Sequence, residues 1–496
     1  MKNKMIQLNP RDNVVVALQD SVAGDTINVG DQHIVILEDV KRGHKVAISE
    51  IEENANVIKY GTPIGHAKQT IHAGDWVHTH NVETNLSGKI DYKYRPEMHP
   101  YTYPKDMRTF KGYVRRDGKV GVRNDLYLIP TVGCINMISD LIINQFKQAH
   151  PDNGAFDEII SLKHPYGCSQ LGGDLETTRK ILIDAAKHPN AGGVLVFGLG
   201  CENNQLEDMK KQMGDYDDSR IKFMICQKVD DEVETGAHLL EELNMYASKD
   251  HRVDLPLSEL KIGLKCGGSD GFSGITGNPL LGRLSDFVVS QGGSTVLTEV
   301  PEMFGAETVL MGRAKNEAVF HKIVHLINNF KDYFASYNQP IYENPSPGNK
   351  AGGITTLEDK SLGCTQKSGT SAVVDVLKYG DKISEKGLSL LQAPGNDQVS
   401  SSALASADCQ MILFTTGRGT PFSTFVPTLK VSTNTQLFEK KGAWIDFNAG
   451  QLLDESMDEV ANKFIQLIID TASGRITKSE LRHIHELAIF KNGVTE

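Results

Sequence analysis

Apolar and polar residues alternate over short distances in the first part of the chain. Segments such as NVVVALQ, HIVILEDV and NVIKYG have the two-residue period of half-buried strands, and Gly-Asp turns separate several of them. We therefore predict a small all-β module over residues 1–87. The next segment, residues 88–110, holds three prolines and several tyrosines without a helical period, which is typical of a linker.

A different pattern begins after residue 110. Continuous apolar runs of strand length, such as DLYLIPTV, VLVFG and QMILFTT, alternate with segments of helical period. This alternation predicts an α/β fold with mostly parallel sheets. A polar connection near residues 250–257 divides the region, so we expect one α/β domain over residues 111–255 and a second over residues 256–496.

The composition narrows the class of protein. Of 496 residues, 39% are hydrophobic and 23% charged, as in ordinary globular proteins, and no run approaches the length of a membrane span. The net charge of −11 without a long basic block argues against a nucleic-acid-binding protein. Seven scattered cysteines argue against a secreted disulfide framework, and the first residues lack a signal-peptide pattern, so we predict a cytoplasmic protein.

Polar, glycine-rich loops follow nearly every predicted buried strand. They read TVGCIN, FGLGCENN, KCGGSDGFSG, TEVPEMFGAE, QAPGND and TTGRGTP. In parallel sheets ligands bind beyond the carboxyl ends of the strands, so these loops predict an active site at one sheet edge. The plain alternative is that glycine only makes tight strand–helix turns. One loop, Gly198 to Asn203, resembles a dinucleotide fingerprint but has Asn203 in place of the third glycine.

The cysteines are the strongest chemical signal. Cys168, Cys201 and Cys364 each follow glycine in similar loops, Cys134 repeats the pattern, and Cys266 precedes two glycines. A thiol at such a position has a lowered pKa and suits metal ligation or nucleophilic work. The alternative is that cysteine is a small buried hydrophobe in a tight turn.

Other candidate residues are polar and suit an anionic, hydroxylated ligand. His78 and His80 are two positions apart on an expected strand, so both would face one way and could contact a metal or a sugar hydroxyl. Residues 339–367 show almost no apolar period and predict a long functional loop. It supplies Asn349, Lys350, Thr355 and Glu358, while Arg418, between two glycines, could hold a carboxylate.

Long motifs connect the chain to a known family. NVIKYGTPIG, VHTHN, HPYGCSQLGGD, GLGCENNQ, CGGSDGFSGITGNP, TEVPEMFGAE and ENPSPGNKAGGITTLEDKSLGCTQK closely resemble the altronate/galactarate dehydratase family, in the same order and over essentially the entire chain. The resemblance implies a β-clip (SAF-like) domain at residues 1–87, a linker, a middle domain associated with dimerisation and a Rossmann-like C-terminal domain. It also implies a homodimer acting on a small-molecule sugar acid, with no nucleic acid or membrane as partner.

The activity implied by the resemblance is loss of water from D-altronate to give 2-dehydro-3-deoxy-D-gluconate in hexuronate catabolism, with Fe²⁺, or alternatively Mn²⁺, as cofactor. We predict that C-terminal-domain loops hold the metal and the substrate carboxylate, while the β-clip covers the hydroxyl chain. The predicted acid and base residues are His78, His80 and Lys350. The predicted substrate-binding residues are Lys59, Asn349, Thr355 and Arg418.

Two arrangements of iron remain open, with Cys168, Cys201, Cys364 and Glu358 as candidate ligands. One is a mononuclear ion with mixed ligands, and the other is an iron–sulfur cluster held by the three cysteines with one open iron position. Other functions also stay open. They are dehydration of galactarate or another sugar acid, sugar-acid binding without turnover, and NAD-dependent oxidation.

Overall fold

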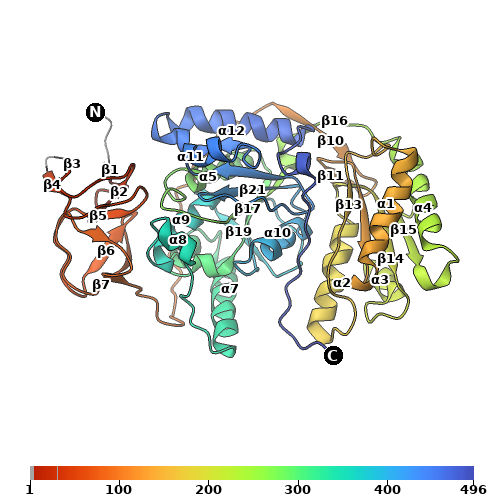
Figure 1. Ribbon diagram of the computed structural model, residues 1–496, viewed down its shortest axis with the longest axis horizontal. Coiled ribbons are helices and arrows are strands. Elements are labelled where there is room, and N and C mark those ends of the chain that lie inside the picture. The colour runs from red at the N-terminus through yellow and green to blue at the C-terminus, as the bar shows by residue number, and fades with distance from the viewer. Residues whose placement is uncertain (1–4, 31) are drawn as a thin grey trace.

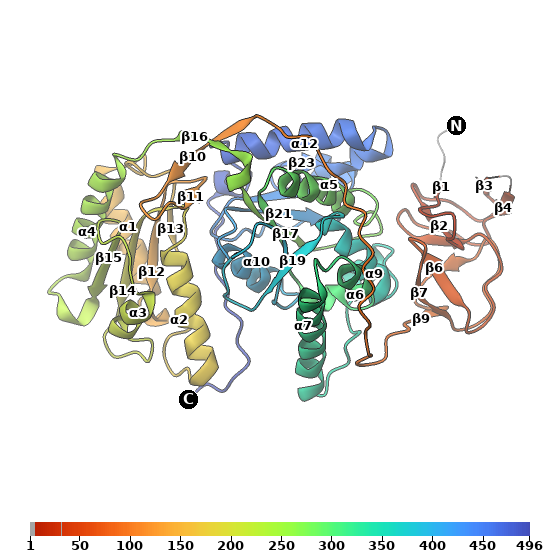
Figure 2. The ribbon, with the colours of Figure 1, turned by 180° about the vertical axis from the view of Figure 1, so that it is seen from behind.

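The computed structural model describes residues 5–30 and 32–496, which form three parts lying in a row (Figure 1). The N-terminal β module occupies one end of the row and the middle domain the other. The C-terminal domain lies between them, and the opposite view shows the same order (Figure 2). The last part of the chain therefore contacts both earlier parts.

The N-terminal module is entirely β, as predicted. Its strands are β1 (Met5–Ile6), β2 (Val14–Ala17), β3 (Thr26–Val29), β4 (Gln32–Val35), β5 (Lys45–Ala47), β6 (Asn56–Lys59), β7 (Thr62–Ala67), β8 (Trp76–Val77) and β9 (Val82–Glu83). They form antiparallel sheets in the orders β1-β2-β5-β8, β3-β4 and β6-β7-β9. β2 is buried along its whole length, which explains its unbroken apolar sequence.

The segment after β9 contains no helix or strand up to Thr109, but it is not a free tether. Tyr92 donates a hydrogen bond to Glu307, and Tyr94 donates to the carbonyl oxygen of Ala314 at 3.3 Å. Tyr94 and Tyr103 also pack against the apolar core of the C-terminal domain. Figure 2 shows this segment running across that domain from β9 to β10. The tyrosines that suggested a linker therefore fix it in place.

The middle domain has a parallel sheet with helices on both faces. Its elements are β12 (Asp125–Pro130), α1 (Asn136–Ala149), β13 (Ile159–Ser161), α2 (Gly172–Ala186), β14 (Ala191–Gly198), α3 (Leu206–Met213), β15 (Ile221–Ile225) and α4 (Glu232–Ala247), in the strand order β13-β12-β14-β15. Leu126 and Leu128 pack with α1 and α4, whereas Tyr127 and Ile129 pack with α2. Alternate residues of one strand thus serve opposite faces.

The C-terminal domain is built on a seven-stranded sheet whose paired strands are all parallel. Its order is β19-β20-β18-β17-β21-β22-β23. The strands are β17 (Lys261–Cys266), β18 (Ser294–Leu297), β19 (Val373–Leu377), β20 (Gly387–Leu391), β21 (Met411–Thr416), β22 (Thr428–Ser432) and β23 (Phe447–Asn448). The helices are α5 (Gly277–Ser290), α6 (Glu307–Gly312), α7 (Glu317–Ser336), α8 (Pro347–Ala351), α9 (Leu357–Thr365), α10 (Asp397–Ser406), α11 (Thr435–Lys440) and α12 (Met457–Ala472). The prediction of a mostly parallel α/β fold is confirmed.

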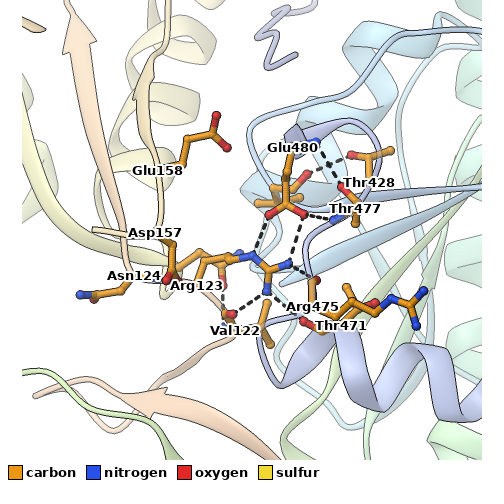
Figure 3. A network of polar contacts seen from close by, with 12 residues as sticks. Val122, Arg123, Asn124, Asp157, Glu158, Thr428, Thr471, Arg475, Thr477 and Glu480 are labelled. Atoms are coloured by element: carbon orange, nitrogen blue, oxygen red, sulfur yellow. Dashed lines mark hydrogen bonds and ion pairs between the residues drawn. The ribbon is translucent and has the colours of Figure 1, made fainter. Parts of the chain in front are cut away.

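The middle and C-terminal domains are joined by paired strands and a buried ion pair. β10 (Thr109–Val114) pairs antiparallel with β16 (Val253–Pro256) and with β11 (Val120–Gly121). Nearby, Arg123 binds both carboxylate oxygens of Glu480, at 2.7 and 3.1 Å, and donates to three backbone carbonyls (Figure 3). All the N–H donors of the guanidinium are therefore hydrogen-bonded, and these buried contacts hold the middle domain against the C-terminal domain. Among the described helices, none is long and apolar enough to cross a membrane.

Candidate metal and substrate site

Three potential metal ligands converge at the carboxyl end of the seven-stranded sheet. Cys266 ends β17, Glu302 lies in the short 3₁₀ helix Val300–Met303, and Cys364 lies in α9. The two Sγ atoms are 3.5 Å apart, and Cys266 Sγ lies 3.1 Å from Glu302 Oε2. All three side chains are buried. Within residues 5–30 and 32–496, only this group brings three such ligand atoms within 4.8 Å of one another.

Lysine side chains surround these ligands. Lys367 donates to Cys266 Sγ at 2.8 Å, and Lys360 pairs with Glu302 at 2.8 Å. The hydrogen bond shared with Cys364 lowers the pKa of Cys266 to about 6, because it and nearby cations outweigh the cost of burial. The same shared hydrogen bond raises the pKa of Cys364. One thiolate and one thiol therefore occupy the site at neutral pH.

The donor set has the chemistry of a transition-metal site. Burial alone would raise the pKa of Glu302, but Lys360 and Lys367 outweigh it and hold that pKa below its usual range. Glu302 is therefore an ionised carboxylate beside two sulfur ligands. Thiolates favour iron or zinc, and a carboxylate also accepts harder ions such as Mn²⁺. Binding would release the remaining thiol proton.

A buried carboxylate of α9 ties the β module to this site. Asp359 accepts hydrogen bonds from Lys45 at 2.8 Å and Lys59 at 2.9 Å, and all three side chains are inaccessible to solvent or nearly so. Burial lowers the pKa of Lys45 to about 8, whereas at Lys59 the attraction of Asp359 exceeds the cost of burial and raises the pKa. Two ammonium groups share one carboxylate, which leaves a net positive charge at the domain boundary.

The predicted acid and base residues lie at the same boundary in different surroundings. His78 is buried, its Nδ1 lies 3.2 Å from Thr355 Oγ1, and its ring stacks on Trp76. Burial lowers the pKa of His78 to about 3, so its imidazole is neutral at neutral pH. His80 is exposed and its ring centroid lies 5.0 Å from that of Trp76, while Lys350 of α8 is half-buried. Both histidines lie in the turn after β8, not on a strand as expected.

Cationic side chains line the space next to the ligands. A narrow cavity between the β module and the C-terminal domain is lined by residues that include Lys59, Tyr60, Asp270, Asp359, Lys360 and Cys364. A wider pocket of about 370 Å³ shares Asp270 with it and is lined by Arg42, Arg418 and Lys440. In a chain with a net charge of −11, this local excess of cations suits an anionic ligand.

The predicted loop over residues 339–367 is largely helical at its centre, where α8 and α9 lie. Every residue of α9 is buried, including Glu358, Asp359 and Lys360. A helix that is buried on all sides with paired charges has no apolar stripe, so the periodicity argument could not detect it. Asn349 lies in α8, where it donates to the carbonyl oxygen of Ser269 at 2.9 Å and accepts from Lys360 at 3.4 Å.

The structure does not bring the four predicted metal ligands together. Cys364 is in the buried group, but Cys168 and Cys201 are exposed on the middle domain. Glu358 accepts hydrogen bonds from Thr84 Oγ1 at 2.9 Å and Asn85 N at 2.7 Å, and so anchors the end of the β module. Cys168 and Cys201 follow strands of the middle-domain sheet, whereas Cys364 lies in α9 of the C-terminal domain, and sequence spacing cannot reveal this difference.

Sequence reasoning did not select Glu302, and it noted Cys266 among the glycine-flanked thiols without choosing it as a metal ligand. Cys266 ends β17 and Glu302 follows β18, in segments that the pattern did single out, KCGG and TEVPEMFG. The available signal was that these two loops follow neighbouring strands, β17 and β18, of one parallel sheet. Without the strand order, neither residue could be paired with Cys364.

The loop that resembled a dinucleotide fingerprint is filled by its own side chain. Glu202 accepts hydrogen bonds from Leu199 N at 3.1 Å and Gly200 N at 2.6 Å. These amides would have to bind a pyrophosphate in a dinucleotide site. Because a carboxylate already takes them, the loop offers no support for NAD binding.

Comparisons with known proteins cover nearly the whole chain. The altronate/galactarate dehydratase SAF domain matches residues 3–85, the D-galactarate dehydratase/altronate hydrolase second domain matches 112–248, and the D-galactarate/altronate dehydratase C-terminal domain matches 257–495.

Full-length relatives differ clearly in their similarity to this chain. It is 58% identical over 492 residues to altronate dehydratase of Bacillus subtilis (strain 168) and 53% identical over 491 residues to that of Escherichia coli (strain K12), with 99% of each chain covered. It is 32% identical over 514 residues to galactarate dehydratase (L-threo-forming) of Escherichia coli (strain K12), covering 98% of this chain and 96% of that protein.

Proposed function

The chain belongs to the altronate/galactarate dehydratase family, and on that premise we propose that it removes water from D-altronate to give 2-dehydro-3-deoxy-D-gluconate in hexuronate catabolism. The observation that carries the proposal is identity of 58% and 53% to two altronate dehydratases over their full lengths, against 32% to a galactarate dehydratase. The enzyme is thus a hydro-lyase, and altronate is its expected substrate in preference to galactarate.

Cys266, Glu302 and Cys364 are the residues that would hold the metal, with Fe²⁺ as the expected ion and Mn²⁺ as the alternative. Two sulfurs and a carboxylate fit such an ion, and the thiol–thiolate pair lies ready to lose its last proton. When bound, the ion would act as a Lewis acid toward the substrate carboxylate and stabilise the charge that develops as the C2 proton leaves.

Lysines of the narrow cavity would supply the remaining charge stabilisation. Glu302 keeps Lys360 protonated and Asp359 keeps Lys59 protonated, since each carboxylate raises its partner's pKa against the cost of burial. Fixed ammonium groups in a buried cavity stabilise an enediolate far better than water does. Arg418, in the wider pocket, would hold the anionic substrate on its way to the cavity.

Proton transfer requires a base at C2 and an acid at the departing C3 hydroxyl. We assign these roles to the β-module histidines, with Lys350 as the alternative base. His78 supports the assignment because its imidazole is neutral and Thr355 fixes its ring. His80 can exchange protons with solvent because it is exposed. Thr355 would position His78, and Asn349 would position Lys360.

Purified protein loaded anaerobically with Fe²⁺ and a thiol reductant tests the function directly. We expect 2-keto-acid formation from D-altronate, and little or none from galactarate or D-mannonate under the same conditions. Turnover of galactarate alone would reassign the substrate. If a fully loaded enzyme formed no keto acid from any of the three, the dehydratase proposal would be wrong and a sugar-acid-binding role would take its place.

Cysteine variants test the metal assignment separately. In protein loaded with Fe²⁺ without added sulfide, we expect Cys266→Ala and Cys364→Ala to lose the Fe²⁺ bound at this group after gel filtration. Turnover should fall by about 100-fold or more, because substitution of a residue that merely orients a metal ligand already costs about 10–100-fold. Cys409→Ala is the matched control, because Cys409 is equally buried but packs in an apolar cluster away from these ligands. Retention of iron and activity in both variants would refute the assignment.

We also propose that the enzyme is a cytoplasmic homodimer. All seven cysteines are free, as expected for a reducing compartment. Light scattering on the purified protein would measure the mass, and a mass of one chain would refute the dimer.

A further inference from the structure

A cysteine follows each of the four strands of the middle-domain sheet. Cys134 follows β12, Cys168 follows β13, Cys201 follows β14 and Cys226 follows β15. Because all four strands are parallel, their carboxyl ends meet at one edge of the sheet. The role assigned to the C-terminal domain makes no use of this edge.

The first three of these loops are hydrogen-bonded to one another. Gly133 N donates to the carbonyl oxygen of Tyr166 at 2.9 Å, which joins the loops after β12 and β13. Asn204 N donates to the carbonyl oxygen of Gly167 at 2.9 Å, which joins the loops after β13 and β14. Each of these four residues is at most three positions from the cysteine of its own loop. The backbone thus holds the three cysteine-bearing loops in mutual contact.

Exposure separates these three cysteines from the other four. Cys134, Cys168 and Cys201 are exposed, Cys226 is intermediate, and the remaining three are buried. A cysteine that serves only as a small hydrophobe is normally among the most buried residues. Three exposed thiols on contacting loops are therefore candidates for metal ligation.

The helices that begin at these loops favour a negatively charged ligand. α1, α2 and α3 all start without a side-chain cap, whereas α4, which follows β15, is capped by Asp231. Uncapped amide groups and the positive end of the helix dipole stabilise an anion. Asp174 of α2 and Glu207 and Asp208 of α3 lie in the first turns of these helices and offset part of this effect.

The spacing of the thiols distinguishes a cluster from a single ion. Thiolates around one tetrahedral Zn²⁺ are ~3.8 Å apart, given a Zn–S distance of ~2.3 Å. Among the described residues, the three ligand atoms of Cys134, Cys168 and Cys201 do not all lie within 4.8 Å of one another. The three thiols are therefore not gathered as ligands of one ion, and in a [4Fe–4S] cluster each cysteine binds a different iron.

We propose that Cys134, Cys168 and Cys201 bind an iron–sulfur cluster of the [4Fe–4S] type, with one iron left to a ligand other than cysteine. This second metal centre lies on the middle domain and uses none of the residues Cys266, Glu302 and Cys364. The proposal does not depend on the substrate assigned above.

Cys226 provides the matched control, because it lies at the same sheet edge but is not suited to be a ligand. It packs against the apolar cluster between α1 and α4. Burial also raises the pKa of the Cys226 thiol to about 11, so it stays protonated at neutral pH. Its substitution should therefore leave the cluster intact.

The experiment measures iron and acid-labile sulfide in anaerobically purified full-length protein, reconstituted with Fe²⁺ and sulfide and then desalted. We expect about four sulfide ions per chain and a visible sulfide-to-iron absorption band. Cys134→Ala, Cys168→Ala and Cys201→Ala should each reduce labile sulfide at least fivefold, while Cys226→Ala, Cys266→Ala and Cys364→Ala should retain it. Circular dichroism confirms that each variant is folded.

Three results would overturn the proposal. One is wild-type protein that binds iron but holds no labile sulfide. A second is sulfide that survives the Cys134, Cys168 and Cys201 substitutions, or that is lost with Cys266→Ala instead. The third is stoichiometric binding of Zn²⁺ at these thiols without sulfide. Each of these is distinguishable from failure of the dehydratase proposal, because keto-acid formation is assayed separately.

Discussion

At the scale of single residues, His188 shows how burial fixes a protonation state. It lies where the middle domain meets the C-terminal domain and is completely buried. Its Nε2 lies 3.3 Å from the carbonyl oxygen of Cys409, and its Nδ1 accepts from Asn190 N at 3.1 Å. One nitrogen must donate and the other accept, so the ring is a neutral tautomer. Burial lowers its pKa to about 3.

This histidine makes the protein sensitive to acid. Below a pH of about 6.5 the imidazole is protonated in the unfolded chain but stays neutral in the folded chain. The free energy of unfolding therefore falls as the pH falls toward 3. Between pH 6.5 and pH 5 we expect this residue alone to reduce the free energy of unfolding by about 2 kcal/mol. Urea unfolding at pH 7 and pH 5 should show a smaller pH-dependent loss for His188→Asn than for the wild type.

The exposed His238 provides the control for this comparison, since its side chain is 74% exposed. His238→Asn should keep the wild-type difference between pH 7 and pH 5. An unchanged difference in His188→Asn as well would show that other buried groups account for the acid sensitivity.

The candidate site also shows which residues a sequence can reveal. Cys364 was selected because thiol and glycine together mark a tight, reactive turn, whereas Lys59 was selected only through the family resemblance. Lys45 and Asp359 were not found as partners, because they are 314 positions apart and meet only when the β module docks on α9. Pairing of buried charges is decided by tertiary structure, which local patterns do not contain.

At the scale of elements, the Arg123–Glu480 pair fastens the start of β12 to the C-terminal segment of the chain (Figure 3). Both side chains are largely buried, and Glu480 also accepts from Thr477 N at 2.8 Å. Removing the arginine leaves a buried carboxylate without its cation. We expect Arg123→Met to lower the free energy of unfolding by about 3–5 kcal/mol.

A double variant separates the loss of the pair from the cost of an unpaired charge. Arg123→Met combined with Glu480→Met should recover most of the lost stability, since two apolar side chains can replace a buried pair nearly without cost. Lys111→Met is the control, because its ion pair with Asp254 at the same domain boundary is more than 60% exposed on both sides and should contribute less than about 1 kcal/mol. Chemical denaturation measures all three, and a double variant as unstable as Arg123→Met would contradict this reasoning.

At the scale of the whole molecule, the sequence pattern predicts three parts but not their arrangement. The change from strand alternation to α/β alternation is local and visible. That the last domain lies between the first two depends on contacts such as Lys59 with Asp359 and Arg123 with Glu480, whose partners are at least 300 residues apart. It also places the β module over α9, so the narrow cavity lined by Lys59 and Cys364 exists only when these two parts are together.

This arrangement predicts that the enzyme can be divided after Ser87 and reassembled. The β module has an apolar cluster made only of its own residues, among them Val15, Ile36 and Val46, and it shares just Ala306 and Leu362 with the C-terminal domain in a second cluster. The linker would stay with the larger fragment, since Tyr92 and Tyr94 are bound there. Both fragments should therefore fold.

Mixing residues 1–87 with residues 88–496 should restore turnover, because the boundary is held by side-chain contacts such as the one between Lys59 and Asp359. The covalent link supplies an effective concentration of about 1 mM, so the rate should now depend hyperbolically on the concentration of the small fragment. Asp359→Asn in the large fragment should raise the half-saturating concentration at least tenfold, which corresponds to about 1.4 kcal/mol. Folded fragments that give no turnover at any concentration would show instead that the chain between them does more than hold the β module in place.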